Sequence, residues 1–368
     1  MSASNSKLKS KPRSKPKRKK DNKIPHTLVL TPGDPSGIGP EITWKAIQSG
    51  DYHLPDSPFS ILCVGAEAPF KSLGAPILKW NPDLGPLQFP KTPSKSPFIW
   101  LLPAPDTAPA GVHLEGFQSG WSIERATQLV LNKQASALVT GPISKERLQG
   151  GGFNYPGHTE FLAHLCKTDR VTMMLANETL RVTLVTIHVG IQNVSKTLTQ
   201  EKLKQTILQT AEALTHYWGI AKPRLAITGL NPHAGESGLF GREEIEVIHP
   251  VIQALQGDPQ NKFEVSGPFA ADTLFAKHYL LSIQEAIYEK IHYDAVVCMY
   301  HDQGLIPVKL LDFYKTVNVT LGLPMIRTSV DHGVGFDIAG KGVANPSSLC
   351  AAIDLAARFA NKVSESLI

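Results

Sequence analysis

The stretch that decides the fold is Thr27-Leu-Val-Leu-Thr-Pro-Gly-Asp-Pro-Ser-Gly-Ile-Gly-Pro-Glu41. Its first part, Thr27 to Leu30, is apolar and predicts a short strand, and the glycine-rich turn Thr31–Pro40 follows. A helical pattern then runs from Glu41 to about Gln48. Proline suits the first position of a helix, and an acidic residue there complements the positive helix end. A strand that leads through such a turn into a helix is typical of an α/β protein.

The same order of strand, loop and helix recurs along the chain. Short apolar runs, partly β-branched, predict buried strands at Ile61–Val64, Ala137–Val139, Thr183–Ile187, Leu225–Thr228 and Ala295–Met299. Helical patterns lie at Ser122–Lys133, 199–218, 242–255 and 283–291, and the proline-rich stretch 76–109 is expected to hold short strands. We therefore predict an α/β fold with a largely parallel sheet.

Length and composition narrow the class of protein. A chain of 368 residues suggests two domains, and 42% hydrophobic with 19% charged residues is ordinary for a globular protein. No apolar run approaches the roughly 20 residues that span a bilayer. The four cysteines, far apart and without a CxxC pair, argue against disulfides and thiolate zinc sites, which favours the reducing cytoplasm.

The net charge of +5 is unevenly distributed. Residues 1–23 hold ten lysines and arginines and one acid, so they carry +9 and the rest of the chain −4. A segment rich in Lys, Ser and Pro cannot bury enough apolar surface to fold, so we expect residues 1–24 to be a disordered basic tail. Such a tail can contact nucleic acid through its charge, but the acidic body makes a nucleic-acid-associated protein a remote alternative.

Three histidines share one setting. His188 directly follows the predicted strand Thr183–Ile187, His233 follows Leu225–Thr228 after a short loop, and His301 follows Ala295–Met299. Ligands gather at the carboxyl ends of strands in open α/β sheets, and neutral imidazoles are common ligands of divalent metals. Asp302, beside His301, is placed to orient it. The alternative for any one of them is a hydrogen-bonded surface histidine, and the spacing matches no short metal motif.

Two further stretches predict an anion site. His158 and Thr159 lie where a helix would present free N–H groups to a phosphate, although Thr159 has the alternative of simply capping that helix. Lys309, Asn318 and Arg327 lie in strand-like, mainly apolar sequence, and the two cations are suited to clamping a doubly charged ligand. Solvated surface cations are the alternative. No GxGxxG follows a strand, which disfavours an ordinary Rossmann domain.

Five motifs in order carry a resemblance to a known family: Gly33-Asp-Pro-Ser-Gly-Ile-Gly-Pro-Glu41, Gly157-His-Thr-Glu160, Asn231-Pro-His-Ala-Gly-Glu236, Met299-Tyr-His-Asp-Gln-Gly304 and Arg327-Thr-Ser-Val-Asp-His-Gly333. Together they resemble the 4-hydroxythreonine-4-phosphate dehydrogenase family of pyridoxal phosphate biosynthesis. The likeness runs from about Pro25 to Lys362.

The resemblance implies a role for each candidate residue. The metal ligands for zinc, magnesium or cobalt are His188, His233 and His301, and the substrate-binding residues are His158, Thr159, Lys309, Asn318 and Arg327. It also implies a homodimer whose partner subunit completes the active site. For proton transfer, Lys309, Asp302 and Asp272 are all candidates, and the sequence does not choose among them.

The glycine-rich turn and Asp337-Ile-Ala-Gly-Lys-Gly-Val-Ala-Asn-Pro346 also resemble isopropylmalate dehydrogenases, which bind NAD without a Rossmann fingerprint. That likeness implies His332, Asp337 and Asn345 as cofactor contacts, with NAD or NADP as the cofactor. It also implies a two-domain α/β/α fold with the active site in the interdomain cleft. We expect one domain from 25–140 plus 323–368 and a second from 141–322.

The expected reaction is the NAD-dependent oxidation of 4-phosphohydroxy-L-threonine. A sister dehydrogenase acting on erythronate or threonate 4-phosphate would share the metal and phosphate residues, so the sequence leaves it open.

Overall fold

The computed structural model describes residues 27–50, 59–82, 96–283 and 293–365. The tail 1–24 and most of the predicted helix 283–291 lie outside the described residues. The strands are β1 Thr27–Thr31, β2 Ser60–Gly65, β3 Ile77–Lys79, β4 Ile99–Pro103, β5 Ala137–Thr140, β6 Thr172–Ala176, β7 Arg181–Leu184, β8 Arg224–Thr228, β9 Glu264–Phe269, β10 Ala295–Cys298, β11 Val317–Leu321 and β12 Ile326–Ser329.

Helices connect most of these strands. The longer ones are α1 Gly39–Ser49, α3 Leu114–Leu131, α7 Gln200–His216, α9 Ala271–Ile283, α10 His301–Leu311 and α11 Ser347–Glu365. The shorter ones are α2 Ala68–Ser72, α4 Lys145–Gly150, α5 His158–Leu165, η2 Ile191–Asn193, α6 Val194–Thr197, η3 Pro232–Gly238, η4 Glu244–Ile248 and α8 His249–Gln256. No described helix combines the length and apolar character needed to cross a membrane.

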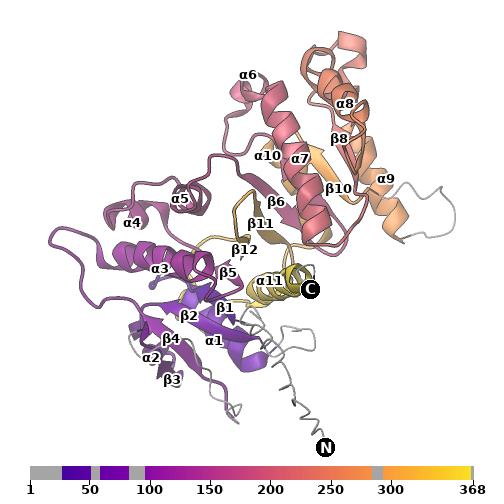
Figure 1. Cartoon of the computed structure of the whole chain (residues 1–368). Coiled ribbons are helices and arrows are strands. Elements are labelled where there is room, and N and C mark those ends of the chain that lie inside the picture. The colour runs from indigo at the N-terminus through magenta and orange to yellow at the C-terminus, as the bar shows by residue number, and fades with distance from the viewer. Residues whose placement is uncertain (1–26, 51–58, 83–95, 284–292, 366–368) are drawn as a thin grey trace, which may run out of the picture.

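The strands form one continuous sheet in the order β3-β4-β2-β1-β5-β12-β11-β6-β7-β10-β8-β9 (Figure 1). Most neighbouring pairs are parallel, which confirms the predicted α/β class with a largely parallel sheet. Three pairs in the middle are antiparallel: β12 with β11, β11 with β6, and β6 with β7. Strands β7, β10, β8 and β9 consequently run opposite to β1, β2, β5 and β12.

Helices cover both faces of the sheet because successive strand side chains point to opposite sides. In β1, Leu28 and Leu30 pack against α1 and α11, whereas Val29 packs in the cluster that contains α3 and α5. The second half repeats this, with α7 and α8 on one face and α10 on the other. The molecule is therefore a three-layer α/β/α structure.

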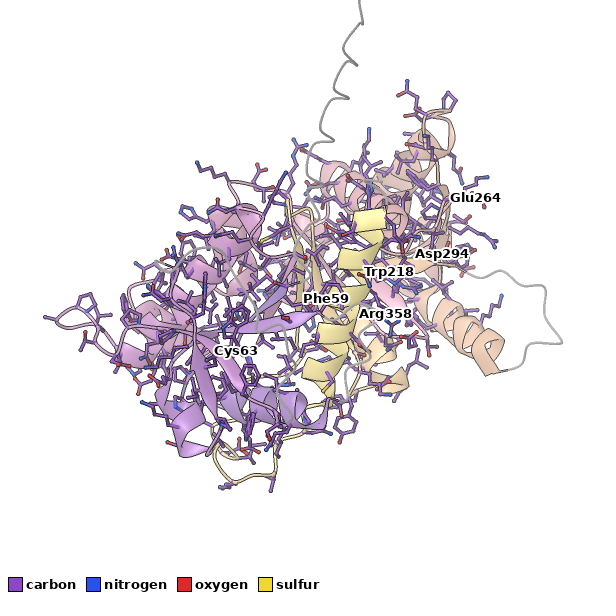
Figure 2. All side chains as sticks on the ribbon, turned by 60° about the horizontal axis from the view of Figure 1, so that its bottom comes forward. Phe59, Cys63, Trp218, Glu264, Asp294 and Arg358 are labelled. Carbon is purple, nitrogen blue, oxygen red and sulfur yellow. The ribbon has the colours of Figure 1, made fainter. Side chains whose placement is uncertain are left out.

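The carboxyl-terminal helix α11 joins the two halves. Its Phe359 ring stacks on Tyr217 at 4.9 Å and meets the Trp218 ring edge-on at 4.5 Å, both at the end of α7. Arg358 on the same helix pairs with Glu178 at 2.9 Å, and Figure 2 shows Trp218 and Arg358 beside each other along α11. Contacts from α11 thus fix the second half of the sheet against the first.

Several predicted boundaries were wrong. The helix predicted at Ser122–Lys133 begins eight residues earlier, at Leu114, where the side chain of His113 accepts the N–H of Gly116 and caps it. The helix predicted at 242–255 is divided into η4 and α8. Lys309 was expected in strand-like sequence but lies in α10, where Leu305 and Val308, three residues apart, are buried on one side of the helix rather than alternating across a strand.

Candidate functional site

The glycine-rich turn after β1 is held by the two loops beside it. Asp34 N–H donates to Pro142 O and Ile38 N–H donates to Val334 O, at 2.9 and 2.8 Å. Gly33 has φ +90°, and a β-carbon there would lie 2.0 Å from Pro142 O, so the turn requires glycine. The turn therefore brings together the loop after β5 and the loop after β12.

Arg327 is the main electrostatic feature of the site. It lies in β12, is 2% exposed, and donates to Thr320 Oγ1 at 2.9 Å and to Thr140 Oγ1 at 2.7 Å. Its Nε has no partner among the described residues, and no described carboxylate pairs with it. Burial lowers the pKa of Arg327 to about 9, so it stays charged at neutral pH. A buried cation without a carboxylate is costly unless an anion binds to it.

His158 and Asn318 have unpaired polar atoms in the same region. The Nε2 atom of His158 and the Oδ1 atom of Asn318 are buried without a hydrogen-bond partner in the described structure. Burial lowers the pKa of His158 well below its ordinary value, and the charge of Arg327 lowers it further, so its imidazole is neutral. Buried polar groups are normally paired, so unpaired ones beside a free cation indicate a ligand site.

His158 is the first residue of α5, and Thr159 is the second. Gly157 occupies the N-cap position, and no side chain caps the helix. The alternative in which Thr159 caps its own helix is therefore wrong. The first N–H groups of α5 instead remain available to an anion.

Lys309 is paired with a residue that the sequence analysis did not single out. Its Nζ lies 3.0 Å from Asp331 Oδ2, and the two side chains are 31% and 15% exposed. Burial raises the pKa of Asp331, against the opposing effect of Lys309. Asp331 lies in the Arg327–Gly333 motif, directly before His332, so its position in that motif was an available signal.

The structure brings two of the three candidate metal histidines together. The ring centroids of His188 and His301 are 6.0 Å apart. His301 Nδ1 lies 2.7 Å from Asp302 Oδ1, which leaves Nε2 as the ring nitrogen that could bind a metal ion. Partial desolvation lowers the pKa of His188, and Lys145 adds to this, so the ring favours its neutral, ligating form. The two imidazoles therefore fit a shared divalent cation.

His233 does not join this pair in the single chain. Within the described ranges, no group of three or more His, Cys, Asp or Glu side chains is arranged to hold a metal ion. His233 is exposed in η3, where its ring lies 6.3 Å from that of Phe240. Residues 233–237 all have positive φ, which the sequence did not predict because four of the five are not glycine.

The candidate cofactor residues lie on the loop between β12 and α11. His332 Nδ1 lies 2.9 Å from Gly333 O, and its Nε2 is buried without a described partner. Asn345 Oδ1 accepts the N–H of Ser347 at the start of α11, and Asp337 is exposed. Asp272, a proton-transfer candidate, is also exposed, in the first turn of α9.

Two residues of α1 hold this loop: Glu41, which was expected from the sequence only to complement the helix end, and Lys45, which was not predicted. Glu41, 4% exposed, accepts the N–H groups of Gly342 and Ala344 at 3.3 and 2.9 Å. Lys45 donates to the carbonyl oxygens of the same two residues and pairs with Glu41 at 2.9 Å. The glycine-rich turn and its helix thus position the loop that carries His332, Asp337 and Asn345.

Cavity size alone does not locate this site. A cavity of about 1150 Å³ opens at the other end of β5 and β12, lined by Ser136, Ile326, Arg170 and Tyr217 among others. It contains none of the predicted site residues. The unpaired buried atoms locate the site better than the hollow does.

Comparison with known proteins identifies the family. The family model of the pyridoxal phosphate biosynthetic protein PdxA matches residues 112–356. A 4-hydroxythreonine-4-phosphate dehydrogenase of Caulobacter vibrioides is 43% identical over 346 residues, covering 90% of this chain and 97% of the relative. The crystal structure of the Klebsiella pneumoniae 4-hydroxythreonine-4-phosphate dehydrogenase superposes with a TM-score of 0.75 at 37% identity, covering 91% and 99%.

Another relative, from Bradyrhizobium diazoefficiens, carries the provisional name D-threonate 4-phosphate dehydrogenase and is 41% identical over 355 residues, covering 92% and 98%. Fold, site and relatives together define an α/β/α dehydrogenase. The chain belongs to the 4-hydroxythreonine-4-phosphate dehydrogenase family.

Proposed function

We propose that the protein oxidises 4-phosphohydroxy-L-threonine with NAD to 2-amino-3-oxo-4-phosphooxybutanoate, which loses carbon dioxide to give 3-amino-2-oxopropyl phosphate. The observation that carries this proposal is the buried Arg327, which has no described carboxylate and lies with the unpaired atoms of His158 and Asn318. Family membership supplies the reaction, and these residues supply the binding site for a phosphorylated substrate.

The substrate phosphate is bound by Arg327 and by the first turn of α5. The guanidinium retains a free Nε–H, and the N–H groups at His158 and Thr159 are free of a side-chain cap. Asn318 contributes its amide from β11, opposite Ser329. Lys309 provides a second cation, and its three N–H groups let it bind a substrate anion while still paired with Asp331.

The metal site is formed by His188 and His301 together with a third imidazole. The resident ion is zinc, magnesium or cobalt, and when bound it lowers the pKa of the substrate hydroxyl and makes hydride loss easier. Asp302 holds His301 in the orientation that presents Nε2. Because His233 is exposed and outside the pair, we infer that one imidazole of the three is contributed across a subunit interface.

The nicotinamide cofactor, NAD or NADP, is bound by the loop that carries His332, Asp337 and Asn345, and it accepts the hydride. For proton transfer Lys309 Nζ is the best placed of the three candidates, because it lies beside Asp331 in the site. Asp302 is engaged with His301, and Asp272 lies in the exposed first turn of α9.

The proposal predicts a specific activity. With 4-phosphohydroxy-L-threonine, NAD and added zinc or magnesium, the purified protein is expected to form NADH, measured at 340 nm. A chelator is expected to abolish the signal and added metal to restore it, because the imidazole ligands are neutral and the bound ion supplies the charge that polarises the hydroxyl. No turnover with any metal would contradict the proposal.

A second candidate is oxidation of D-threonate or D-erythronate 4-phosphate, favoured by the Bradyrhizobium relative. These compounds carry a hydroxyl where the threonine compound carries an ammonium, and the phosphate end is the same. Running them in parallel decides between the two. A higher kcat/KM with a sugar acid phosphate would leave the assignment of the site residues unchanged and would replace 4-phosphohydroxy-L-threonine as the proposed substrate.

We also propose a homodimer, since α10 has an uncovered apolar face. Ile306 and Leu310, four residues apart on α10, are 64% and 85% exposed, and Phe313 and Tyr314 in the turn that follows the helix are 61% and 58% exposed. Leu310→Asp is expected to weaken association by at least about 2 kcal/mol and to lower activity with it. Leu78→Asp, at an exposed position on the distant strand β3, is the control. Sedimentation velocity showing an intact Leu310→Asp dimer would exclude this face.

The location and the domain division are also proposals. All four cysteines are free thiols, which favours the reducing cytoplasm. We infer that 25–140 with 323–368 and 141–322 act as two lobes around the site. The basic tail lies outside the described residues, and its contact with nucleic acid remains the remote alternative.

A further inference from the structure

The loop that carries His233 has a conformation that its own residues do not favour. His233, Ala234, Gly235, Glu236 and Ser237 have φ of +53°, +52°, +83°, +43° and +56°, a full left-handed turn with one glycine. Left-handed helical backbone costs roughly 1–2 kcal/mol for each residue with a β-carbon. Such strain persists only where surrounding contacts fix the segment. The contacts that fix this loop therefore also determine the position and orientation of the His233 imidazole.

One buried carboxylate accepts three hydrogen bonds at the entry to this loop. Glu244 is 2% exposed. Its Oε1 accepts the backbone N–H of Leu230 at 2.7 Å and of Asn231 at 2.8 Å. Its Oε2 accepts the side-chain N–H of Asn231 at 2.9 Å. Both residues directly precede Pro232 and His233, so Glu244 fixes the entry to the left-handed turn.

The same carboxylate also lies close to Gly235, on the other side of His233. A β-carbon at Gly235 would lie only 2.6 Å from Glu244 Oε2, and one at Gly229 would lie 3.0 Å from Oε1. The loop therefore wraps around the carboxylate from both flanks. Glu244 is the first residue of η4, a π-helical turn, and such turns are frequent at functional sites.

We propose that Glu244 is the positioning residue of His233: it touches neither substrate nor cofactor but holds the strained loop in the conformation that presents the imidazole. This inference rests on the proposed function, in which His233 is a metal ligand. Groups that orient a metal ligand contribute about 10–100-fold to metal affinity.

The role requires a carboxylate rather than an amide. Each N–H that Glu244 accepts needs an oxygen, and the two oxygens of a carboxylate serve all three. A glutamine has one oxygen, so its NH₂ group must face either the backbone N–H groups or the amide of Asn231. Two donors then oppose each other in a buried site, and the loop can relax toward right-handed backbone.

The test is Co²⁺ affinity of the full-length protein, read from cobalt absorption during titration and from competition with a chromophoric chelator. Glu244→Gln is expected to bind Co²⁺ about 10–100-fold more weakly than wild type. At saturating metal its KM for substrate stays within about twofold of wild type, since the phosphate residues are untouched. Glu246→Gln is the control, because the Glu246 side chain is 58% exposed and, among the described residues, pairs with Arg242 alone. Its Co²⁺ affinity is expected to be unchanged.

Gly235→Ala is a second variant that keeps Glu244. The added carbon would push the carboxylate away, so Co²⁺ affinity should fall in the same direction. Wild-type affinity in Glu244→Gln overturns the inference. If wild-type protein binds no Co²⁺, the metal assignment of the proposed function has failed. Amide hydrogen exchange of residues 229–238 then tests, without any metal, whether Glu244 holds the loop. Faster exchange in Glu244→Gln than in wild type supports that role, and unchanged exchange overturns it.

Discussion

Replacing Arg327 with methionine is expected to stabilise the ligand-free protein while removing most of its activity. In the free protein the guanidinium is 2% exposed and is held by two threonine hydroxyls, without a described carboxylate. Replacing buried ionic groups by apolar residues of similar volume often gains about 1–4 kcal/mol. A rise in melting temperature by a few degrees is therefore expected.

The loss of activity has the same cause. Arg327 supplies the buried charge for the substrate phosphate, and truncating one partner of such a buried pair costs about 2–5 kcal/mol. That range corresponds to a fall in kcat/KM of about 30-fold to several thousandfold. Arg327→Lys should recover little, since an ammonium cannot replace the forked contacts to Thr140 and Thr320.

The measurements are thermal unfolding without ligand and steady-state kinetics. Arg125→Met is the matched control, because Arg125 lies on α3 and makes an exposed hydrogen bond with Gln128. It should change neither quantity. A less stable Arg327→Met protein would show that the free guanidinium is satisfied by contacts other than those described. Unchanged kcat/KM would remove Arg327 from the phosphate site.

The sequence predicts the local parts of this fold well. The strands β2, β5, β8 and β10 lie within or close to the apolar runs that predicted them, because a strand buried on both faces needs continuous apolar sequence. The reversal of direction at β11 and β6 was not predicted. Strand direction is set by pairing between distant segments, and the pattern within one segment does not encode it.

The site residues divide in the same way, into those that local sequence predicts and those that depend on contacts between distant segments. His301 was found because it follows a predicted strand, and Arg327 because it is a cation in strand-like, mainly apolar sequence. Glu244 and Asp331 were missed, because their importance depends on partners distant along the chain or on burial that no local pattern reveals. The left-handed turn at His233 opposes local preference, and only its tertiary contacts account for it.

His301→Ala is expected to abolish turnover and to leave the fold intact. Its side chain is 37% exposed, so the free energy of unfolding should change little. Losing one of a pair of imidazoles 6.0 Å apart should prevent metal binding, and with it the several kcal/mol that a Lewis acid supplies, a loss of about a thousandfold or more.

Asp302→Asn distinguishes the orientation of the His301 ring by Asp302 from the binding of the metal by His301 itself. It retains His301 but replaces the carboxylate 2.7 Å from Nδ1, so metal affinity should fall by about 10–100-fold while activity returns at high metal concentration. His216→Ala, which removes an exposed histidine of α7, is the control for both variants. Metal content by atomic absorption, circular dichroism and NADH formation distinguish the cases. A folded, metal-free His301→Ala protein that turns over like wild type would show that oxidation at this site needs no metal, and the polarising charge would then have to come from Lys309 and Arg327.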